Sequence, residues 1–278
     1  MTLSVKKLQP AHINNMSYNE FIGLVRETNR PPGGYASISR IAEKTFLRKG
    51  QSLLEIGTST GIAAIEFARL TRARIVGIDI NPTSLREARQ RAQCYGVSQW
   101  IHFELANAMA LPYRDSSFDI VFCGNVTSLV ASRDKALAEY SRVLKIGGYL
   151  ASIPMYYLRP PSKNLLRRVS DAIQVPIQPL YKDYWIRFFA RPPFESYFIE
   201  DYAFDRISPE VVKEFVRNIL HRDHLKDLRP TTKATLNHRY AQYMQLFREN
   251  LAHMGYSIML LRKESNPMDA ELFTSRKL

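Results

Sequence analysis

Two glycines and one acidic residue, at a characteristic separation, indicate a site for a nucleotide-like ligand. The run Leu53–Ile56 is short and apolar, as in a buried strand of a parallel sheet, and Gly57 ends it. Gly57 and Gly61 bracket a turn of small residues before a helix, whose N-terminal N–H groups favour an anionic group. Asp79 follows about 22 residues after Gly57, at the end of a second apolar strand, 75–78. A carboxylate at that position can accept both hydroxyls of a ribose.

The spacing of this turn separates two kinds of nucleotide site. The dinucleotide fingerprint G-x-G-x-x-G is absent, because the turn reads G-x-x-x-G. The segment Glu55–Gly61 instead resembles the first motif, (D/E)-x-G-x-G-x-G, of the S-adenosylmethionine-dependent methyltransferases of the Rossmann-like type. Ser59 stands where that motif has its middle glycine, so we expect the backbone to approach the cofactor less closely there. Two alternative interpretations of this strand–turn–helix are a purely structural role in an α/β protein and a site for another ligand.

A second segment strengthens the resemblance. Residues 107–121 are similar to the D-A-x-x-L-P-F-x-D-x-S-F-D-x-V segment of the branch that includes the ubiquinone and menaquinone biosynthesis methyltransferases. The resemblance implies that the first residue accepts a hydrogen bond from the adenine amino group, which Asn107 can do through its amide oxygen. Lys145–Leu150 is similar to the family's L-K-P-G-G-x-L turn, with Ile146 in place of proline. The ordered motifs across residues 53–153 imply S-adenosyl-L-methionine as the cofactor.

The resemblance implies a set of cofactor contacts at the carboxyl ends of the predicted strands. We expect S-adenosylmethionine to be bound by Glu55, Gly57, Thr58, Ser59, Gly61, Asp79, Ile80, Asn107, Ala108, Met109, Gly124 and Asn125. No catalytic residue is predicted, because a sulfonium methyl is already activated and the enzyme must mainly align it. No metal is expected, since the sequence has no H-E-x-x-H motif and no cysteine or carboxylate cluster.

Residues 1–50 are predicted to form an N-terminal helical lid. Residues 18–25 have helical apolar spacing, and 37–46 is expected to be a second helix. The loop Arg30–Tyr35 between them holds two prolines and two glycines, which end a helix. In related methyltransferases an N-terminal helix closes over the cofactor, often with a tyrosine. The resemblance therefore makes Tyr18 a cofactor candidate and Tyr35 a substrate candidate. A packed N-terminal layer with an ordinary turn explains the same pattern.

The elements that must position these residues predict an α/β fold. We expect a Rossmann-like, doubly wound, seven-stranded and mostly parallel sheet with an inserted cap. The cofactor-binding core is assigned to residues 51–153 and 237–278. Within the second part we expect a helix at 237–253 and a closing hairpin of strands 257–262 and 271–276, with the final strand antiparallel.

Residues 154–236 are predicted to form an inserted substrate cap. Prolines punctuate this segment and aromatic side chains are frequent in it. Its clearest element is an amphipathic helix at 209–220, for which Ser208 is the expected N-cap.

The first part of the cap suggests how an acceptor molecule is recognised. Seven basic and two acidic residues lie between Arg159 and Arg191, interleaved with aromatic rings. Such an arrangement can stack on a flat anionic substrate and neutralise it. Tyr156, Tyr157 and Arg159 follow the fifth strand directly and are expected to line the mouth of the pocket. The alternative is that the rings pack the cap and the arginines are solvated.

The bulk composition indicates a globular protein with an unusual charge. The net charge of the 278-residue chain is +13, of which residues 1–150 carry +7 and residues 151–278 carry +6. A spread excess of this kind favours carboxylate, phosphate or nucleic-acid partners, or serves solubility. Arg86, Arg89 and Arg91 of a helix expected at 83–95 are assigned to a solvated face.

Two features of the sequence bear on where the protein works. No apolar segment approaches the length of a membrane span, and no signal-peptide pattern occurs at the N-terminus. Cys94 and Cys123 are isolated thiols without metal-ligand spacing. We therefore expect a cytoplasmic protein with reduced cysteines.

Three hypotheses for the function follow. The first is an enzyme that methylates an O, N or C nucleophile of a small molecule, for which an anionic or aromatic metabolite fits the composition. The second is a methyltransferase that modifies RNA or a nucleotide, suggested by the charge. Gly124–Thr127 stands where a flipped-base motif N-P-P-Y or D-P-P-Y would follow the fourth strand, which disfavours a nucleic-acid amine. The third is a non-catalytic cofactor-binding regulatory protein, against which the intact Asp79 counts.

Overall fold

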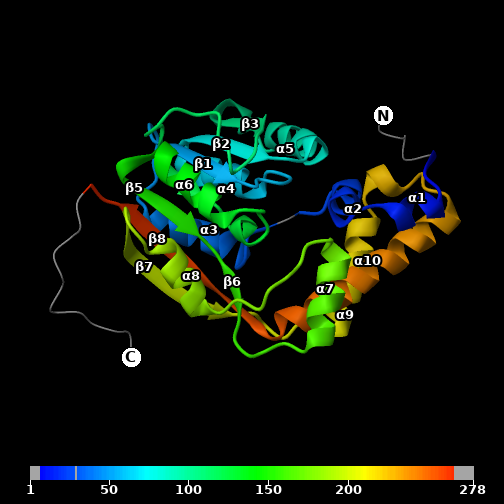
Figure 1. Cartoon of the computed structure of the whole chain (residues 1–278). Helices are drawn as coiled ribbons and strands as arrows, with labels where there is room; N and C mark the ends of the chain where they lie inside the picture. The colour runs from blue at the N-terminus through cyan, green and yellow to red at the C-terminus, as the bar shows by residue number, and fades with distance from the viewer. Residues whose placement is uncertain (1–6, 29, 266–278) are drawn as a thin grey trace.

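The protein consists of a twisted sheet covered by helices on both faces and, beside it, a bundle of further helices (Figure 1). The computed structural model describes residues 7–28 and 30–265. We call the sheet and the helices on it the core. We call the bundle the helical body, which comprises α1 (Pro10–Asn15), α2 (Tyr18–Val25), α7 (Lys163–Ile173), α9 (Pro209–Leu220) and α10 (Pro230–Leu251).

The sheet has the predicted mostly parallel, doubly wound arrangement. Its strands are β1 (Ser52–Ile56), β2 (Arg74–Asp79), β3 (Ile101–Leu105), β4 (Phe118–Phe122), β5 (Leu144–Ser152), β6 (Met155–Tyr157), β7 (Phe194–Ala203) and β8 (Met254–Lys263). The order runs β3-β2-β1-β4-β5-β8, with β1 to β5 parallel and β8 antiparallel to its neighbours. β6 pairs with β8 just beyond β5 along the same edge, and β7 pairs along the other edge. Eight strand segments therefore occupy seven positions across the sheet.

Alternating side chains of the strands build one apolar layer on each face of the sheet. Leu53 of β1 lies in the layer covered by α3 (Gly34–Lys44), α4 (Ile62–Thr71) and α5 (Pro82–Cys94). Its neighbour Leu54 lies in the opposite layer, covered by α6 (Arg133–Val143) and α8 (Lys182–Phe189). Because both faces are covered, β1 is buried along its whole length, as expected for a central parallel strand.

The segment predicted to be a cap divides between the core and the helical body. β6, α8 and β7 belong to the sheet and its covering layer, whereas α7 and α9 belong to the helical body. The partner of β8 differs from the expected hairpin, since β7 pairs with β8 from Phe194–Lys263 to Ala203–Gly255. The predicted strand 271–276 lies outside the described residues. The sequence pattern did not predict β7, because this edge strand is mostly half-buried or exposed and has no regular apolar alternation.

The helical body has an apolar centre of its own, built from distant parts of the chain. Phe21 and Val25 of α2 pack with Val216 of α9 and Leu236 and Tyr240 of α10. α10 thus begins seven residues before the expected helix at 237–253 and lies outside the core to which that helix was assigned.

The predicted N-terminal lid and the predicted helix 209–220 compare differently with the structure. The predicted lid is divided, because α1 and α2 join the helical body whereas α3 packs on α4 in the core. The expected helix 209–220 is confirmed as α9, where the Ser208 side chain accepts a hydrogen bond from the Val211 N–H at 3.4 Å.

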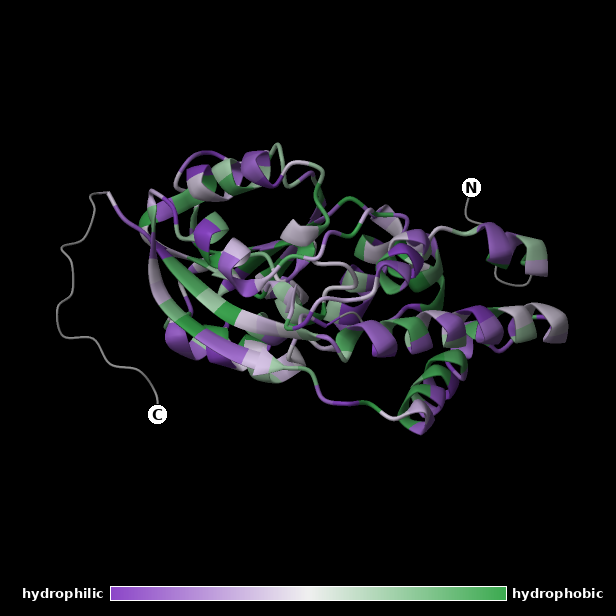
Figure 2. Ribbon diagram, turned by 60° about the horizontal axis from the view of Figure 1, so that its bottom comes forward, coloured by the Kyte–Doolittle hydropathy of each residue, from purple (hydrophilic) through white to green (hydrophobic). Residues whose placement is uncertain are grey.

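Hydrophobic and hydrophilic residues alternate along α10 (Figure 2), and its buried residues, among them Leu236, Tyr240 and Tyr243, recur every three or four positions on one face. In the part of the chain that the structure describes, no helix has the length and apolar character needed to cross a membrane.

Candidate cofactor-binding site

The turn between β1 and α4, residues 57–61, has a backbone that few residue types can adopt. Gly57, Ser59 and Gly61 have φ angles of +70°, +49° and +80°. A Cβ atom on Gly57 would lie 2.7 Å from Cγ2 of Val126, and one on Gly61 would lie 2.8 Å from Cβ of Ala88. Glycine is therefore required at both positions by sterics as well as by conformation. We call residues 57–61 the glycine turn.

Ser59 adopts a left-handed conformation at the position where the family motif has glycine. The carboxylate of Asp79 supports this conformation, because its Oδ2 accepts a hydrogen bond from the Ser59 N–H at 2.8 Å. The other oxygen, Oδ1, accepts from the N–H of Asn81 at 2.9 Å. Burial raises the pKa of Asp79 above its usual value, and the backbone hydrogen bonds oppose that shift. The carboxyl end of β2 thus fixes the glycine turn that follows β1.

Glu55, at the end of β1, is bonded to the buried Thr58 of the glycine turn. Glu55 is 5% exposed, and its Oε2 accepts a hydrogen bond of 2.7 Å from the hydroxyl of Thr58, which is also buried. Burial raises the pKa of Glu55 to about 7, and the nearby charge of Asp79 adds to the shift. Both residues were expected among the cofactor contacts. In this position their hydrogen bond supports the backbone of the turn.

The carboxyl ends of β2 and β3 bring together an apolar side chain and a polar turn. Ile80 is 71% exposed directly after β2, and Asn107 lies in the turn after β3, the neighbouring strand. Oδ1 of Asn107 accepts a hydrogen bond from the N–H of Met109 at 2.9 Å, which closes this turn, and Ala108 is buried. An exposed isoleucine next to a polar turn can take the flat face and polar edge of a purine base.

The carboxyl end of β4 contributes Gly124 and Asn125. Gly124 has a φ of +34°, and a Cβ atom there would lie 3.8 Å from Cβ of Pro31. Oδ1 of Asn125 accepts a hydrogen bond from the N–H of Met155 at 2.9 Å, which ties β4 to the start of β6. The Arg30–Tyr35 loop therefore passes over the same edge of the sheet as the glycine turn.

The two tyrosines predicted for the lid occupy different environments. Tyr18 packs edge-on against Tyr243 and Phe247 of the helical body, with ring centroids 5.3 and 5.5 Å apart, and burial raises its pKa. Tyr35 is 41% exposed in the first turn of α3, with the guanidinium of Arg30 4.8 Å above its ring. Tyr18 thus contributes to the packing of the helical body, while Tyr35 lies exposed at the start of α3, directly after the loop at the edge of the sheet.

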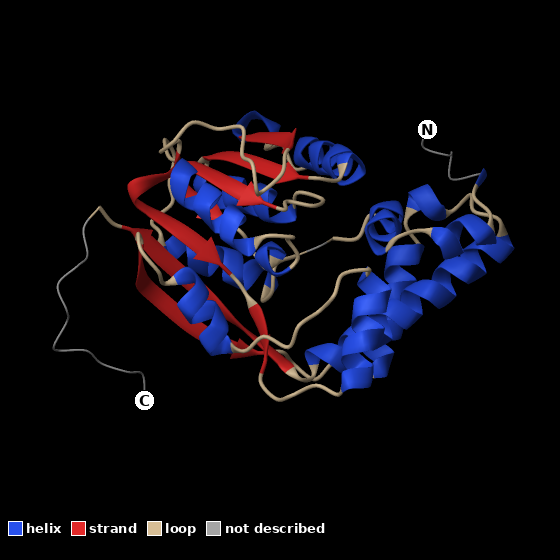
Figure 3. Ribbon diagram, in the orientation of Figure 1, coloured by secondary structure: helices blue, strands red, loops and turns tan. Residues whose placement is uncertain are grey.

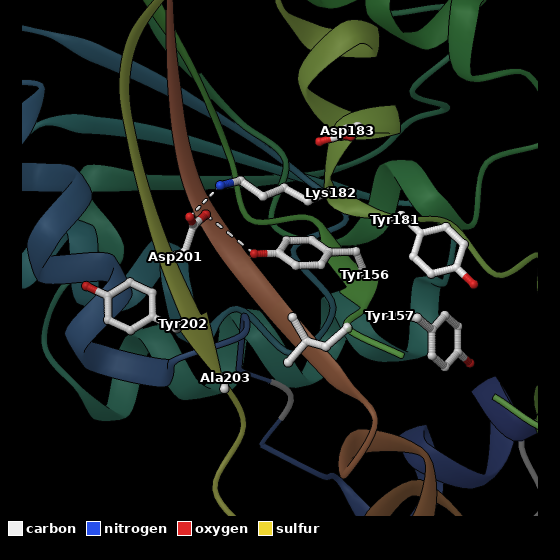
Figure 4. A pocket seen from close by; sticks show the side chains of 9 residues that line it. Tyr156, Tyr157, Tyr181, Lys182, Asp183, Asp201, Tyr202 and Ala203 are labelled. Atoms are coloured by element: carbon white, nitrogen blue, oxygen red, sulfur yellow. Dashed lines mark hydrogen bonds and ion pairs between the residues drawn. The ribbon is translucent and has the colours of Figure 1, made fainter. Parts of the chain in front are cut away.

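The residues predicted for the acceptor site divide as well. Tyr156 and Tyr157 line a surface pocket of about 480 Å³, from which Arg159 is absent (Figure 4). The hydroxyl of Tyr156 lies 3.0 Å from Oγ of Ser257, and that of Tyr157 donates to Oδ1 of Asn250 at 2.8 Å. The remaining lining residues are Leu158, Tyr181, Lys182, Asp183, Asp201, Tyr202 and Ala203. No residue of the glycine turn contributes to this pocket, so it is separate from the cofactor-binding edge.

The aromatic and basic residues of the expected cap have structural partners. Trp185, Phe188 and Phe189 of α8 pack into the apolar layer on the sheet. Arg191 lies 2.6 Å from a carboxylate oxygen of Asp134. These three rings thus pack against the sheet, whereas Tyr181 and Tyr197 of the same segment are exposed.

Sequence reasoning missed the one α5 arginine that the hydrogen bonds of the described residues join to the glycine turn, Arg91. The side chain of Arg91 is only 12% exposed and donates to Oγ1 of Thr60 at 2.9 Å. Arg89 donates to the carbonyl oxygen of Phe103 at 2.7 Å. The assignment of these arginines to a solvated face was wrong for Arg91 alone, since Arg86 and Arg89 are exposed. The signal was the helical period, since Arg91 lies three residues after the buried Ala88 on the same face of α5.

A buried carboxylate next to the turn was also missed. The carbonyl oxygen of Glu27 accepts a hydrogen bond from the hydroxyl of Thr60 at 3.0 Å. Its side-chain Oε2 accepts one from the hydroxyl of Tyr240, in α10, at 2.7 Å. Burial raises the pKa of Glu27, which the Tyr240 hydroxyl and the charge of Arg222 oppose. Glu27 has no motif around it, so only the meeting of two distant segments shows its place.

Comparisons with known proteins agree with this geometry. Residues 54–152 match the family model described as a methyltransferase domain. An uncharacterized protein of Haemophilus influenzae is 30% identical over 180 residues, which are 64% of this chain and 72% of that protein. The chain belongs to the S-adenosylmethionine-dependent methyltransferases of the Rossmann-like class I type, a family of enzymes. The cofactor is S-adenosylmethionine, and the strained glycine turn with Asp79 at its side fits it.

Relatives with named activities match only part of the chain. A ubiquinone/menaquinone biosynthesis C-methyltransferase UbiE of Pasteurella multocida is 37% identical over 138 residues, 46% of this chain and 52% of that enzyme. The chain thus spans about half the length of this named relative. Among solved structures, the MccD protein has a TM-score of 0.72 at 24% identity and covers 85% of this chain and 100% of its own. The [4+2]-cyclase SpnF has a TM-score of 0.65 at 23% identity over 84% and 82% of the two chains. These two likenesses show the fold alone.

Proposed function

We propose that this protein transfers the methyl group of S-adenosylmethionine to an O, N or C nucleophile of a small molecule. The observation that carries the proposal is the hydrogen bond from the Ser59 N–H to Asp79, which joins the glycine turn to the carboxyl end of the next strand. Ligands of open parallel sheets bind at this edge. In the same structure Ile80 and Asn107 stand one and two strands away from the turn.

These residues suggest how the cofactor lies. Asp79 accepts the ribose hydroxyls, each carboxylate oxygen having a lone pair beyond its backbone hydrogen bond. Ile80 and the turn Asn107–Met109 hold the adenine, and Gly57 faces the methionine end. The bound cofactor supplies an activated methyl group. The chain's own task is then to bind and orient both reactants.

The acceptor approaches from the side of the helical body in this proposal. The arrowheads of β1, β2 and β4 point toward that body (Figure 3). The net charge of +13 supports an anionic acceptor. Tyr35, exposed in the first turn of α3, remains our candidate for an acceptor contact. The tyrosines of β6 line the separate pocket, and Arg159 is not among its lining residues.

The experiment that tests the function uses the cofactor itself. The full chain is incubated with methyl-labelled S-adenosylmethionine and, in parallel, with a metabolite extract, with total tRNA or with buffer. We expect label in a small molecule from the extract, with weak dependence on salt. Label in tRNA with a steep salt dependence would support the RNA-modifying alternative instead.

A protein that binds the cofactor without transferring its methyl group is the second candidate. The [4+2]-cyclase SpnF shares the fold over most of the chain, so the fold does not require methyl transfer. Binding of S-adenosylhomocysteine without any labelled product from extract or tRNA would support that candidate.

We also propose a cytoplasmic location, on the two isolated thiols Cys94 and Cys123.

A further inference from the structure

The chain between α2 and the Arg30–Tyr35 loop is held by side chains from both parts of the molecule. Arg26, the C-cap of α2, has a left-handed backbone with a φ of +52°. Its carbonyl oxygen accepts hydrogen bonds from two guanidinium groups, Nη2 of Arg91 at 3.4 Å and Nη1 of Arg222. Arg91 belongs to α5 of the core, and Arg222 follows α9 of the helical body. One backbone carbonyl therefore joins the two parts.

On the core side, this junction continues into the glycine turn. Nη1 of Arg91 donates to Oγ1 of Thr60 at 2.9 Å and to its carbonyl oxygen at 3.3 Å. The hydroxyl of Thr60 in turn donates to the carbonyl oxygen of Glu27, the residue next to Arg26. Glu87 neutralises the guanidinium groups of Arg91, at 3.1 Å, and Arg26, at 3.4 Å.

On the side of the helical body, Arg222 and Tyr240 hold the same short segment. Arg222 donates to the carbonyl oxygen of Val25 at 3.3 Å and to the hydroxyl of Thr28 at 3.0 Å. Tyr240 donates to the carboxylate of Glu27 at 2.7 Å. Arg222 and Tyr240 thus hold each of the four residues 25–28, and the glycine turn holds this segment at the carbonyl oxygen of Glu27.

The electrostatics of the junction make it cooperative. Burial and the neighbouring charge of Arg222 lower the pKa of Arg91, and Glu87 opposes both effects. Two guanidinium groups this close are stable only while carbonyl oxygens and carboxylates surround them. A buried donor that loses its partner is costly, so the contacts of Arg91 and Arg222 support each other through the Arg26 carbonyl.

We propose that Arg91 and Arg222 are positioning residues that couple cofactor binding at the glycine turn to the docking of the helical body. The proposal rests on the proposed function, since it takes the glycine turn as the cofactor site. A cofactor that holds Thr60 in its present place stabilises the junction. By reciprocity, an intact junction stabilises the turn in the form that binds the cofactor. Arg222 would therefore affect cofactor affinity although, among the described residues, its hydrogen bonds go to Val25, Arg26 and Thr28.

The test measures binding of S-adenosylhomocysteine to the full chain by calorimetry. This probe has no net charge near neutral pH, so removing a distant positive charge has little direct electrostatic effect on it. We expect Arg222→Gln to weaken binding about 5- to 10-fold, the size of a typical coupling between two sites. The matched control is Arg217→Gln, an exposed arginine of α9, the helix that precedes Arg222, for which we expect an unchanged affinity.

A double-mutant cycle shows whether the two arginines act together. We expect Arg91→Gln with Arg222→Gln to bind no more weakly than the worse single variant, because either change breaks the same junction. Arg26→Asn, which tolerates the left-handed backbone and keeps the carbonyl, should bind within about two-fold of wild type.

Hydrogen exchange supplies a readout beyond affinity. S-adenosylhomocysteine should slow amide exchange at the C-terminal end of α2 and around residue 222 in the wild type, but only at the glycine turn in Arg222→Gln. Should Arg222→Gln unfold the helical body, Arg222→Lys keeps the charge and loses the forked hydrogen bonds. Wild-type affinity in a folded Arg222 variant, or independent effects in the cycle, would overturn the coupling. Failure of the wild type itself to bind the probe would refute the proposed function instead.

Discussion

The glycine turn and the helical body are stabilised over very different distances along the chain. The turn depends on its own backbone conformation and on Asp79, which is twenty residues from Ser59. The helical body depends on contacts such as Phe21 with Tyr243, whose ring centroids lie 5.3 Å apart although the residues are far apart in sequence. The comparison shows that the glycine turn is held by contacts close in the sequence, whereas the adjoining helical body is assembled from distant segments.

The largest expected effect is that of Gly57→Val on the turn. A β-branched side chain is strained at a φ of +70°, and its Cβ would meet Val126 at 2.7 Å. We expect S-adenosylhomocysteine binding to weaken at least about 100-fold and the free energy of unfolding to fall by about 2–4 kcal/mol. Calorimetry and urea unfolding measure the two effects. Adding Val126→Ala should recover part of the stability, and a variant that still binds normally would place the cofactor elsewhere.

Leu236→Ala tests the other side of the comparison. Leu236 is fully buried in the helical body, so its truncation leaves a cavity. We expect a loss of about 2–5 kcal/mol in the free energy of unfolding, with S-adenosylhomocysteine affinity within about two-fold of wild type while the protein is folded. Leu129→Ala, at a partly exposed site, is the control for stability. A large loss of affinity in a folded Leu236→Ala would show that packing inside the body also shapes the turn.

The pH dependence of stability tests the carboxylate of Glu55, which is bonded to Thr58 of the turn. The pKa of Glu55 rises on folding from 4.5 to about 7, so the folded state binds a proton more tightly than the unfolded state. The contribution of Glu55 to the free energy of unfolding is therefore largest at low pH. It falls by up to about 3 kcal/mol as the pH rises from about 4.5 to about 7. Urea unfolding at pH 5, 6, 7 and 8 should show a flatter profile for Glu55→Gln. Equal slopes for the two proteins would contradict the buried, protonated state.

Asp79→Ala is expected to act mainly on the ligand and on the shape of the turn. It removes the acceptor of the Ser59 N–H and the proposed partner of the ribose. We expect S-adenosylhomocysteine binding to weaken by about 1–3 kcal/mol, measured by calorimetry. Asp115→Ala, an exposed carboxylate paired with Arg142, is the matched control and should leave the affinity unchanged. Unchanged affinity in Asp79→Ala would remove the basis for the ribose assignment.

The smallest expected effect is that of Ser59→Gly, which restores the family's residue at a left-handed position. Glycine relieves the strain of a φ of +49° but gains freedom in the unfolded chain. We expect a rise in stability of at most about 1 kcal/mol and an equal or tighter affinity for S-adenosylhomocysteine. Thermal unfolding and calorimetry decide this. A clear loss of affinity would mean that the serine hydroxyl itself contacts the cofactor.

Features that depend on neighbours in the chain were predictable from the sequence. The glycine turn, the acidic residue after the second strand and the helix capped by Ser208 all occur where the sequence analysis expects them. In each case the signal is a short-range one: a positive φ that requires glycine, or an N-cap hydroxyl beside an orphan N–H. The matching family motifs add the order of the parallel strands.

Only the tertiary structure decided the rest. The edge of β8 is occupied by β7, an edge strand whose exposure hides the usual alternation, so no local pattern distinguishes it from a loop of the cap. Arg91 and Arg222 gain their roles only because α5 and the segment after α9 meet at the Arg26 carbonyl, nearly 200 residues from one of them. Pairing of sheet edges and docking of helices depend on which distant surfaces are buried together. That information is carried by the whole chain and by no short stretch of it.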